Sequence, residues 1–108
     1  MEGETLKGHL DLLLLAVVRQ GMMHGYRVIE ALRDRSRGAF DLAEGTVYPA
    51  LHRLERAGLL ESAWATAEGR RRRMYSLTRR GESALAEQQQ LWKQFARGMN
   101  SVLQGVLG

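Results

Sequence analysis

The 108-residue sequence contains no cysteine. This absence excludes a disulfide-stapled secreted scaffold, a thiol nucleophile and a cysteine-ligated zinc site. Long apolar runs are also missing, because the longest, from Leu12 to Val18, has only seven residues and a bilayer span needs about 20. The acidic start Met1-Glu2-Gly3-Glu4 lacks the basic region of a signal peptide. We therefore expect a soluble, cytoplasmic protein with no membrane segment.

Motifs for catalysis and metal binding are equally scarce. The spacing of His9, His24 and His52 matches no metal-binding pattern. The sequence has no Gly-x-Ser-x-Gly motif, no P-loop and no glycine fingerprint for a dinucleotide. We therefore expect no enzyme activity, no cofactor and no metal site.

Basic charge is the feature that stands out among the residues present. The chain has 16 Lys and Arg against 12 Asp and Glu, a formal net charge of +4. Six arginines fall within positions 70 to 80, a segment without any acidic residue: Arg70, Arg71, Arg72, Arg73, Arg79 and Arg80. Basic charge gathered on one short segment favours a polyanion as the partner. Nucleic acid is the first candidate and an anionic membrane surface the second.

The spacing of apolar residues predicts three helices, a β-hairpin and a long last helix. Gly21 and Gly58 are expected to end the first and third helices, while Thr46 and Thr78 are possible caps at the start of the third and last. This order is typical of a mainly helical α+β protein with a winged helix-turn-helix domain over residues 1–78 and a C-terminal dimerisation helix over 79–108. The predicted helices span about 6–20, 25–36, 45–57 and 79–104, and the strands 59–66 and 72–77, joined by a flexible basic tip.

The first predicted helix is apolar on two faces, which a short monomer has difficulty covering. Leu10, Leu13, Leu14 and Val17 form one stripe, whereas Leu12, Leu15 and Val18 form another. The last predicted helix carries apolar residues at heptad spacing. We therefore expect a homodimer in which a partner covers the second stripe, with the interface formed by Leu12, Leu15, Leu85, Trp92, Phe95, Met99 and Val102.

The outer face of the third predicted helix suits the major groove of DNA, which admits one helix. Thr46, Tyr48 and Pro49 would lie toward the groove floor, and Arg53 would reach a phosphate or a guanine. Arginines at the hairpin tip suit a narrow minor groove. The predicted DNA-binding residues are Thr46, Tyr48, Pro49, His52, Arg53, Arg70, Arg71 and Arg72, together with Tyr26.

At these residues the chain resembles the PadR-type transcriptional regulators. The stretch from Glu44 to Leu59 is similar to their signature through its G-T-x-Y-P-x-L-x-R-L-E core. Three flanking segments fit the same pattern: His24-Gly25-Tyr26, Gly69 to Tyr75 and Leu77 to Gly81. The resemblance covers about residues 6 to 104. The resemblance implies a homodimeric repressor whose last helix packs on the first helix of its partner. The chain length is similar to that of the short branch of this family, whose members have a single C-terminal helix.

Four positions depart from that pattern. Ala43 stands where the family usually has a serine, so the resemblance implies that a helix cap is lost here. Arg71 replaces a common wing proline, Met74 a common aromatic residue and Ser76 a common basic residue. These departures concern the shape and phosphate contacts of the wing.

Trp92 falls where multidrug-sensing members of the short branch carry a tryptophan. In those proteins the tryptophans of two subunits stack on flat aromatic ligands at the dimer centre. The resemblance therefore implies a small aromatic effector, and Asp11 would favour a cationic one. The predicted ligand-binding residues are Trp92, Leu12, Leu15, Asp11, Leu85, Gln88 and Gln89.

Each of these predicted functional residues also has a simpler structural interpretation. Trp92 and Phe95 could form plain dimer core, Tyr48 could pack beside Pro49, and the arginine run could be a solvated loop. His24 is expected to close the start of a helix by local hydrogen bonding, Trp64 to pack at the base of the wing, and His52 to face either solvent or phosphate. For the whole chain, the alternatives are an effector-independent winged helix, a protein-interaction module and an RNA-binding winged helix.

Overall fold

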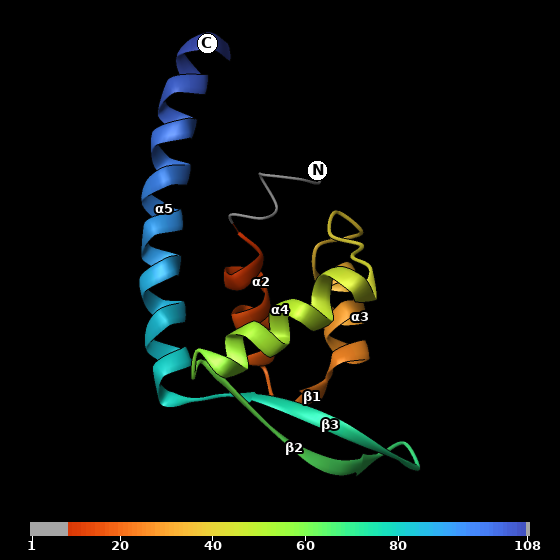
Figure 1. Cartoon of the computed structure of the whole chain (residues 1–108). Coiled ribbons are helices and arrows are strands. Elements are labelled where there is room, and N and C mark those ends of the chain that lie inside the picture. Colours follow the sequence, from red (N-terminus) through yellow and green to blue (C-terminus); the bar gives the residue numbers. More distant parts are fainter. Residues whose placement is uncertain (1–8, 108) are drawn as a thin grey trace.

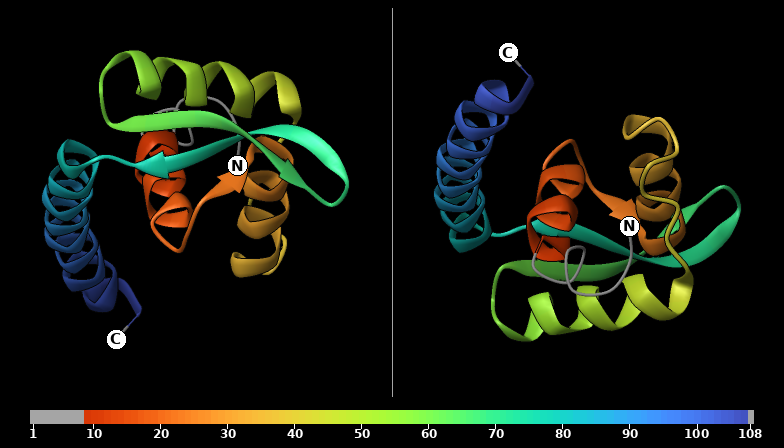
Figure 2. Two further views of the ribbon diagram at one scale, coloured as in Figure 1. Left: turned by 90° about the horizontal axis from the view of Figure 1, so that it is seen from below. Right: turned by 90° about the horizontal axis from the view of Figure 1, so that it is seen from above.

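The computed structural model describes residues 9–107 and has the predicted order of elements (Figure 1). Helices α2, α3 and α4 form one unit with a small sheet below them, and α5 runs along one side and extends beyond the rest (Figures 1 and 2). The molecule measures 54 × 27 × 21 Å. The elements are α2 (Leu10–Val18), β1 (Met23–His24), α3 (Gly25–Arg35), α4 (Glu44–Arg56), β2 (Leu60–Ala67), β3 (Arg70–Leu77) and α5 (Arg79–Leu107).

The core lies between α2, α3, α4 and the sheet. Leu14 and Leu15 of α2 are fully buried, and so are Val47 and Leu51 of α4. Leu85, near the start of α5, is only 2% exposed and belongs to the same cluster. The prediction that a partner must cover the stripe containing Leu15 is therefore wrong, because the chain's own elements bury that residue. α2 can be apolar nearly all round since it contacts α3, α4, β3 and α5.

The sheet has three antiparallel strands in the order β1-β3-β2. In the hairpin, Leu60 pairs with Leu77 and Ala67 pairs with Arg70, so the strands are joined by only two residues. Those residues, Glu68 and Gly69, both have positive φ (54° and 75°), as a tight type I′ turn requires. The predicted flexible tip is therefore wrong, and Arg70 and Arg71 lie in a paired strand. The two-residue strand β1 was not predicted, because so short a segment has no alternation to read.

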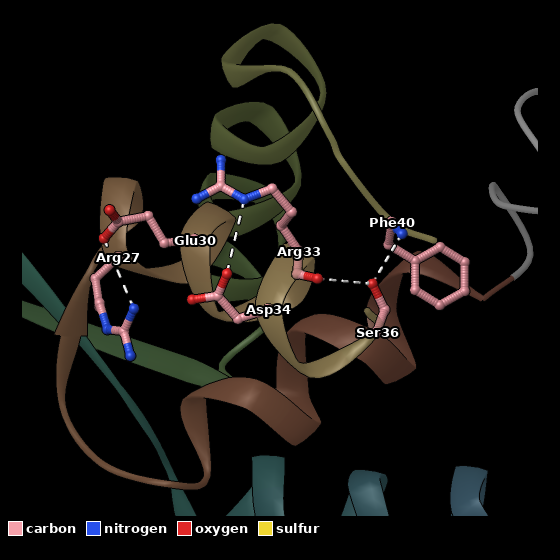
Figure 3. A network of polar contacts seen from close by, with 6 residues as sticks. All are labelled: Arg27, Glu30, Arg33, Asp34, Ser36 and Phe40. Atoms are coloured by element: carbon pink, nitrogen blue, oxygen red, sulfur yellow. Dashed lines mark hydrogen bonds and ion pairs between the residues drawn. The ribbon is translucent and has the colours of Figure 1, made fainter. Parts of the chain in front are cut away.

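The chain leaves α3 through a left-handed turn. Arg37 (φ 55°) and Gly38 (φ 84°) follow the helix, and the Gly38 N–H donates to the carbonyl of Arg33 (2.8 Å). The Ser36 hydroxyl donates to the same carbonyl (3.3 Å) and accepts from the Phe40 N–H (2.8 Å), as Figure 3 shows. The ion pairs drawn there, Arg27–Glu30 and Arg33–Asp34, are both 3.7 Å long and lie on the surface of α3. These bonds direct the chain from α3 into α4.

α4 starts earlier than predicted. Its N-cap is Ala43, which has no side-chain capping bond, so the expectation of a lost cap at Ala43 is confirmed and Thr46 is not the cap. Pro49 is the sixth residue of the helix, beyond its first turn, and its missing N–H cannot bond the carbonyl of Gly45. The helix ends as predicted at Gly58, whose φ of 81° lets the Leu59 N–H donate to the Leu54 carbonyl (3.0 Å).

Thr78 caps α5, as predicted. Its hydroxyl oxygen accepts from the Gly81 N–H (3.0 Å) and the same hydroxyl donates to the carbonyl of Gly58 (2.6 Å). The start of α5 is thereby tied to the end of α4. A Cβ atom on Gly81 would collide with the carbonyl oxygen of Leu59, so glycine is required for this close approach.

His24 caps α3, which confirms its predicted local hydrogen bond. The Arg27 N–H donates to Nδ1 of His24 (3.1 Å), so the imidazole must be unprotonated at that atom. The side chain is only 9% exposed. Burial, followed by the nearby Arg72 guanidinium, lowers the pKa of His24.

This cap predicts a pH-dependent stability. Because the folded chain disfavours the charged imidazole, the free energy of unfolding should be constant above about pH 6.5, the ordinary pKa of histidine. It should fall as pH falls below that value toward the lowered folded pKa, because the unfolded chain then takes up the proton first. Denaturant unfolding at pH 7.5 and 5.5 measures the slope.

The variant His24→Asn keeps an acceptor at the cap and cannot titrate. It should remove this part of the slope, while His52→Asn, which changes an exposed histidine, should retain it. An equal slope in the wild type and His24→Asn would contradict this role of His24.

Candidate nucleic-acid interface

One face of α4 is buried and the opposite face is bare. The 3.6-residue repeat places Gly45, Pro49, His52 and Arg56 along the centre of the exposed face. Thr46 and Arg53 lie on the flank toward α2, and Tyr48 and Glu55 on the flank toward the sheet. The predicted set omitted Arg56, although its place four residues beyond His52 on the same face was readable from the helical repeat.

Tyr48 is half-buried and packs against the start of α3. A Cβ atom on Gly25 would lie 2.5 Å from Cε1 of Tyr48, so the ring rests directly on the glycine. Burial, with the carboxylate of Glu44 as a lesser cause, raises the pKa of Tyr48. The phenol ring is therefore partly committed to packing against Gly25.

The wing exposes an aromatic residue between two arginines. Trp64 of β2 is 56% exposed, so the expectation that it packs at the wing base is wrong. The guanidinium carbons of Arg71 and Arg73 lie 5.5 Å and 5.6 Å from the centre of its ring, within cation–π range. Arg73 was not in the predicted set, although strand alternation places it opposite Trp64 in the sheet. Arg72 is half-buried, and its Nε atom has no hydrogen-bond partner.

A basic cleft of about 270 Å³ separates α4 from the wing. Glu55 lies at its edge, where its carboxylate accepts from the Ser62 hydroxyl (2.6 Å) and pairs with Arg73 (3.6 Å). The guanidinium groups in the cleft outnumber this carboxylate, and arginine forks match the geometry of phosphate. The arrangement can therefore hold an anion. The cleft is lined by His24, Gly25, Tyr48, His52, Trp64, Arg71, Arg72, Arg73 and Tyr75.

Arg53, which was predicted to contact DNA, forms an ion pair with Asp11. Its NH1 and NH2 groups donate to the two carboxylate oxygens of Asp11, at 3.0 Å and 2.6 Å. The hydrogen bond to Asp11 raises the pKa of Arg53 above its ordinary value. A residue predicted to contact DNA and one predicted to contact a ligand thus bind each other.

A second hollow, of about 390 Å³, lies between α2 and α5. The ring of Trp92 is at its wall, 5.1 Å from the ring of His9 in an edge-on arrangement and 5.7 Å from that of Phe95. Four predicted ligand-binding residues line it, together with residues that were not predicted. The lining is Asp11, Leu12, Gln88 and Trp92 from the predicted set, with His9, Leu91 and Phe95.

Three predicted ligand-binding residues lie elsewhere. Leu15 and Leu85 are buried in the core and present no surface to the hollow. Gln89 is on the other side of α5, in a depression beside Arg19 and Glu82. The prediction is wrong for Leu15 and Leu85, because the chain's own core buries both. Gln89 points away from this hollow because adjacent helical residues such as Gln88 and Gln89 lie about 100° apart.

An apolar strip runs along the outer half of α5. Its large side chains are between 44% and 70% exposed, and it continues from the hollow toward the end of the helix. Leu85 was predicted to belong here but is buried in the core, whereas Leu91 and Leu103 were overlooked. The strip consists of Leu91, Trp92, Phe95, Met99, Val102 and Leu103.

Other kinds of site are absent from the part of the chain that the structure describes. Over residues 9–107, no cluster of three His, Cys, Asp or Glu side chains could hold a metal ion. Within the same range, no helix is both long and apolar enough to span a membrane.

Three packed helices, the last with a bare outer face, and an arginine-rich hairpin beside it define a winged helix-turn-helix DNA-binding module. The family model described as "Transcriptional regulator PadR-like family" matches residues 14–87. This chain therefore belongs to the PadR-like family of DNA-binding transcriptional regulators.

Relatives support the assignment along the whole chain. Transcriptional regulator Rv3488 of Mycobacterium tuberculosis is 42% identical over 65 residues, which are 60% of this chain and 61% of that protein. A PadR family regulator from Clostridium difficile is 33% identical with a TM-score of 0.78, covering 89% of this chain and 99% of the other. A PadR-like regulator from Bacillus cereus has a TM-score of 0.84 at 28% identity, covering 94% and 98%.

The contact between Gly25 and Tyr48 predicts a steric test. Gly25→Ala should lower the free energy of unfolding by about 1–3 kcal/mol, because the new methyl group overlaps the Tyr48 ring. Thermal or denaturant unfolding measures this loss. The matched control is Gly45→Ala, since no atom lies within 4 Å of a Cβ built there. Equal stability of the two variants would show that the ring moves aside without cost.

Proposed function

We propose that this PadR-family regulator is a homodimeric repressor that reads a pseudo-palindromic DNA operator and is released by a small planar aromatic effector. The observation that carries the proposal is the continuity between the bare face of α4 and the arginine-rich wing, across the cleft that both elements line. A helix and a hairpin on one side of the molecule match the shape of a groove and the adjacent backbone of double-stranded DNA.

The bare face of α4 supports close approach to base edges. Gly45 and Pro49 carry no long side chain, so the helix backbone can lie near the groove floor, and the apolar ring of Pro49 suits a thymine methyl group. His52 and Arg56 extend this face toward phosphates. On the wing, Arg71 would reach the backbone while Trp64 holds its guanidinium in place. If one dimer neutralises about six phosphates, its affinity falls steeply with salt.

The apolar strip of α5 supports a second copy of this chain as the dimer partner. Soluble monomers rarely expose a contiguous apolar patch of this kind. The strip follows heptad spacing over Trp92, Phe95, Met99 and Val102, which suits packing against another helix. A twofold axis through such a contact presents two copies of α4 to half-sites about 34 Å apart.

The hollow beside Trp92 supports the effector. Its volume of about 390 Å³ is within the range of small-molecule sites. Aromatic walls from Trp92 and Phe95 favour stacking on a planar ring, and the carboxylate of Asp11 favours a cationic one. An effector relieves repression when it binds one dimer geometry better than the geometry that fits the operator.

A mobility-shift assay with DNA from upstream of the chain's own gene tests the proposed function. We expect a specific complex that outcompetes scrambled duplexes and weakens with salt. Equal affinity for all duplexes would indicate an architectural or protein-interaction module. A preference for RNA would indicate an RNA-binding winged helix.

In the same assay, Tyr48→Ala should weaken specific binding by about 1–3 kcal/mol, because the ring supplies apolar surface and supports the start of α4 against α3. Tyr48→Phe retains the ring and should keep most of the affinity. Sedimentation should show both variants as dimers. Unchanged operator affinity in Tyr48→Ala would show that Tyr48 does not contribute to the DNA interface.

The dimer is tested by a charge in the apolar strip. Phe95→Glu should give a monomer in analytical ultracentrifugation, because a paired interface would bury the carboxylate without a partner, and operator binding should fall with it. Gln90→Glu adds the same charge to an exposed position about 140° away from Phe95 around α5 and should leave the dimer intact. A dimeric Phe95→Glu variant would contradict the proposed interface.

A further inference from the structure

Ion pairs tie α4 to its neighbours on both flanks. Among the four ion pairs in residues 9–107, two lie within α3. The other two involve α4: Glu55 pairs with Arg73 of the wing, and Arg53 pairs with Asp11 of α2. Apolar contacts hold the inner face of the helix but are not directional. The charged pairs therefore add directional contacts between α4 and both α2 and the wing.

The pair on the α2 flank has the better geometry. Arg53 and Asp11 are 42 residues apart in sequence, and both carboxylate oxygens accept from the guanidinium fork, at 2.6 Å and 3.0 Å. A bidentate fork specifies orientation as well as distance. The Glu55–Arg73 contact is a single one at 3.6 Å. Asp11 is thus the stronger polar constraint on the exposed side of α4.

The same carboxylate also faces the hollow beside α5. Asp11 lines that space together with Leu12, Gln88 and Trp92. One acidic side chain therefore stands between the space where a planar guest would stack and the helix that would enter the DNA groove. Among residues 9–107 it is the one acidic side chain in the lining of the hollow, so within that range it is the carboxylate with which a cation there would pair.

We propose that Asp11 is a positioning residue, which through Arg53 holds α4 in the orientation needed for operator binding. A cationic planar aromatic guest beside Trp92 displaces Arg53 from this carboxylate and thereby weakens operator binding. This inference rests on the proposed function, since it names the regulation of that site. Arg53 donates to both carboxylate oxygens and neutralises their charge, so a second cation gains most from Asp11 when Arg53 moves away. The exchange is reciprocal: operator DNA opposes the guest as much as the guest opposes the operator.

Operator affinity tests the positioning role. Asp11→Asn and Arg53→Gln should each weaken specific binding about 3- to 10-fold, as expected for an exposed bidentate pair counted twice in a dimer. The double variant should lose no more than either single variant, because both substitutions break one interaction. The exchanged pair Asp11→Arg with Arg53→Asp should restore part of the affinity. Asp34→Asn removes an equal charge from an exposed pair on α3 and should have no effect.

Two outcomes would overturn the positioning role without touching the proposed function. If Arg53→Gln weakens binding while Asp11→Asn matches or exceeds the wild type, Arg53 contacts phosphate directly and Asp11 only masks it. If neither single variant differs from the wild type, the pair has no part in binding. By contrast, a wild type that shows no sequence-specific DNA binding refutes the proposed function itself.

Guest binding without DNA tests the exchange. The background variant Trp64→Phe leaves Trp92 as the sole tryptophan, and its fluorescence reports binding of the cation 1-methylquinolinium or its neutral analogue 1-methylnaphthalene. We expect the cation to bind more tightly than the neutral compound, and Asp11→Asn to abolish this preference. Arg53→Gln should increase affinity for the cation several-fold, because it releases the carboxylate, and should leave the neutral compound unaffected.

This last effect separates exchange from a merely structural role, since loss of packing would weaken both compounds together. An unchanged ratio of cation to neutral affinity in both variants would overturn the exchange. Failure of the cation to quench Trp92 at all would overturn it as well. Thermal unfolding confirms that each variant is folded before it is used.

Discussion

The burial of one apolar stripe of α4 is the constraint on which the other features depend. Val47, Leu51 and Leu54 are buried against the rest of the core, and together they contribute several kcal/mol of transfer free energy. With this side fixed inward, the helical repeat leaves no choice about which residues face outward. The identity of the outward face, with Gly45, Pro49, His52 and Arg56 at its centre, follows from burial before any contact with DNA is considered.

The same logic explains how far the fold could be predicted from sequence. Periodicity located the hairpin and the helices that lie within residues 9–107, because burial of a stripe leaves a repeat of 3.6 or 2 residues that can be counted. Periodicity failed to predict the element boundaries that a few hydrogen bonds determine. The start of α4 moved from Thr46 to Ala43, and the hairpin turn closed over Glu68 and Gly69, since backbone pairing extended the strands further than the side-chain pattern showed. Strand β1 has only two residues, too few to show an alternating side-chain pattern.

The site was predicted less completely because individual side-chain contacts between distant segments carry no local signal. Nothing near Arg53 in the sequence indicates Asp11, 42 residues away. Leu15 was placed at a subunit interface because α2 is apolar on two faces, and Leu85 because of the heptad spacing of α5. Both residues are instead buried in the chain's own core. Arg56 and Arg73 could have been found from the repeat of their own elements. The contact of Tyr48 with Gly25 required the structure.

The proposed regulation depends on the position of the two exposed groups of residues relative to each other. The DNA-facing surface lies on α4 and the wing, while the apolar strip and the hollow lie on α5 and α2. Within one subunit, a signal at the hollow would reach α4 through the contacts that join α2 to α4. Closely packed apolar side chains resist such motion, because any gap loses dispersion energy at once. An exposed ion pair can exchange its partner at small net cost, because its own contribution to stability is small. Coupling through Asp11 and Arg53 would therefore change the inclination of α4 while leaving the core intact.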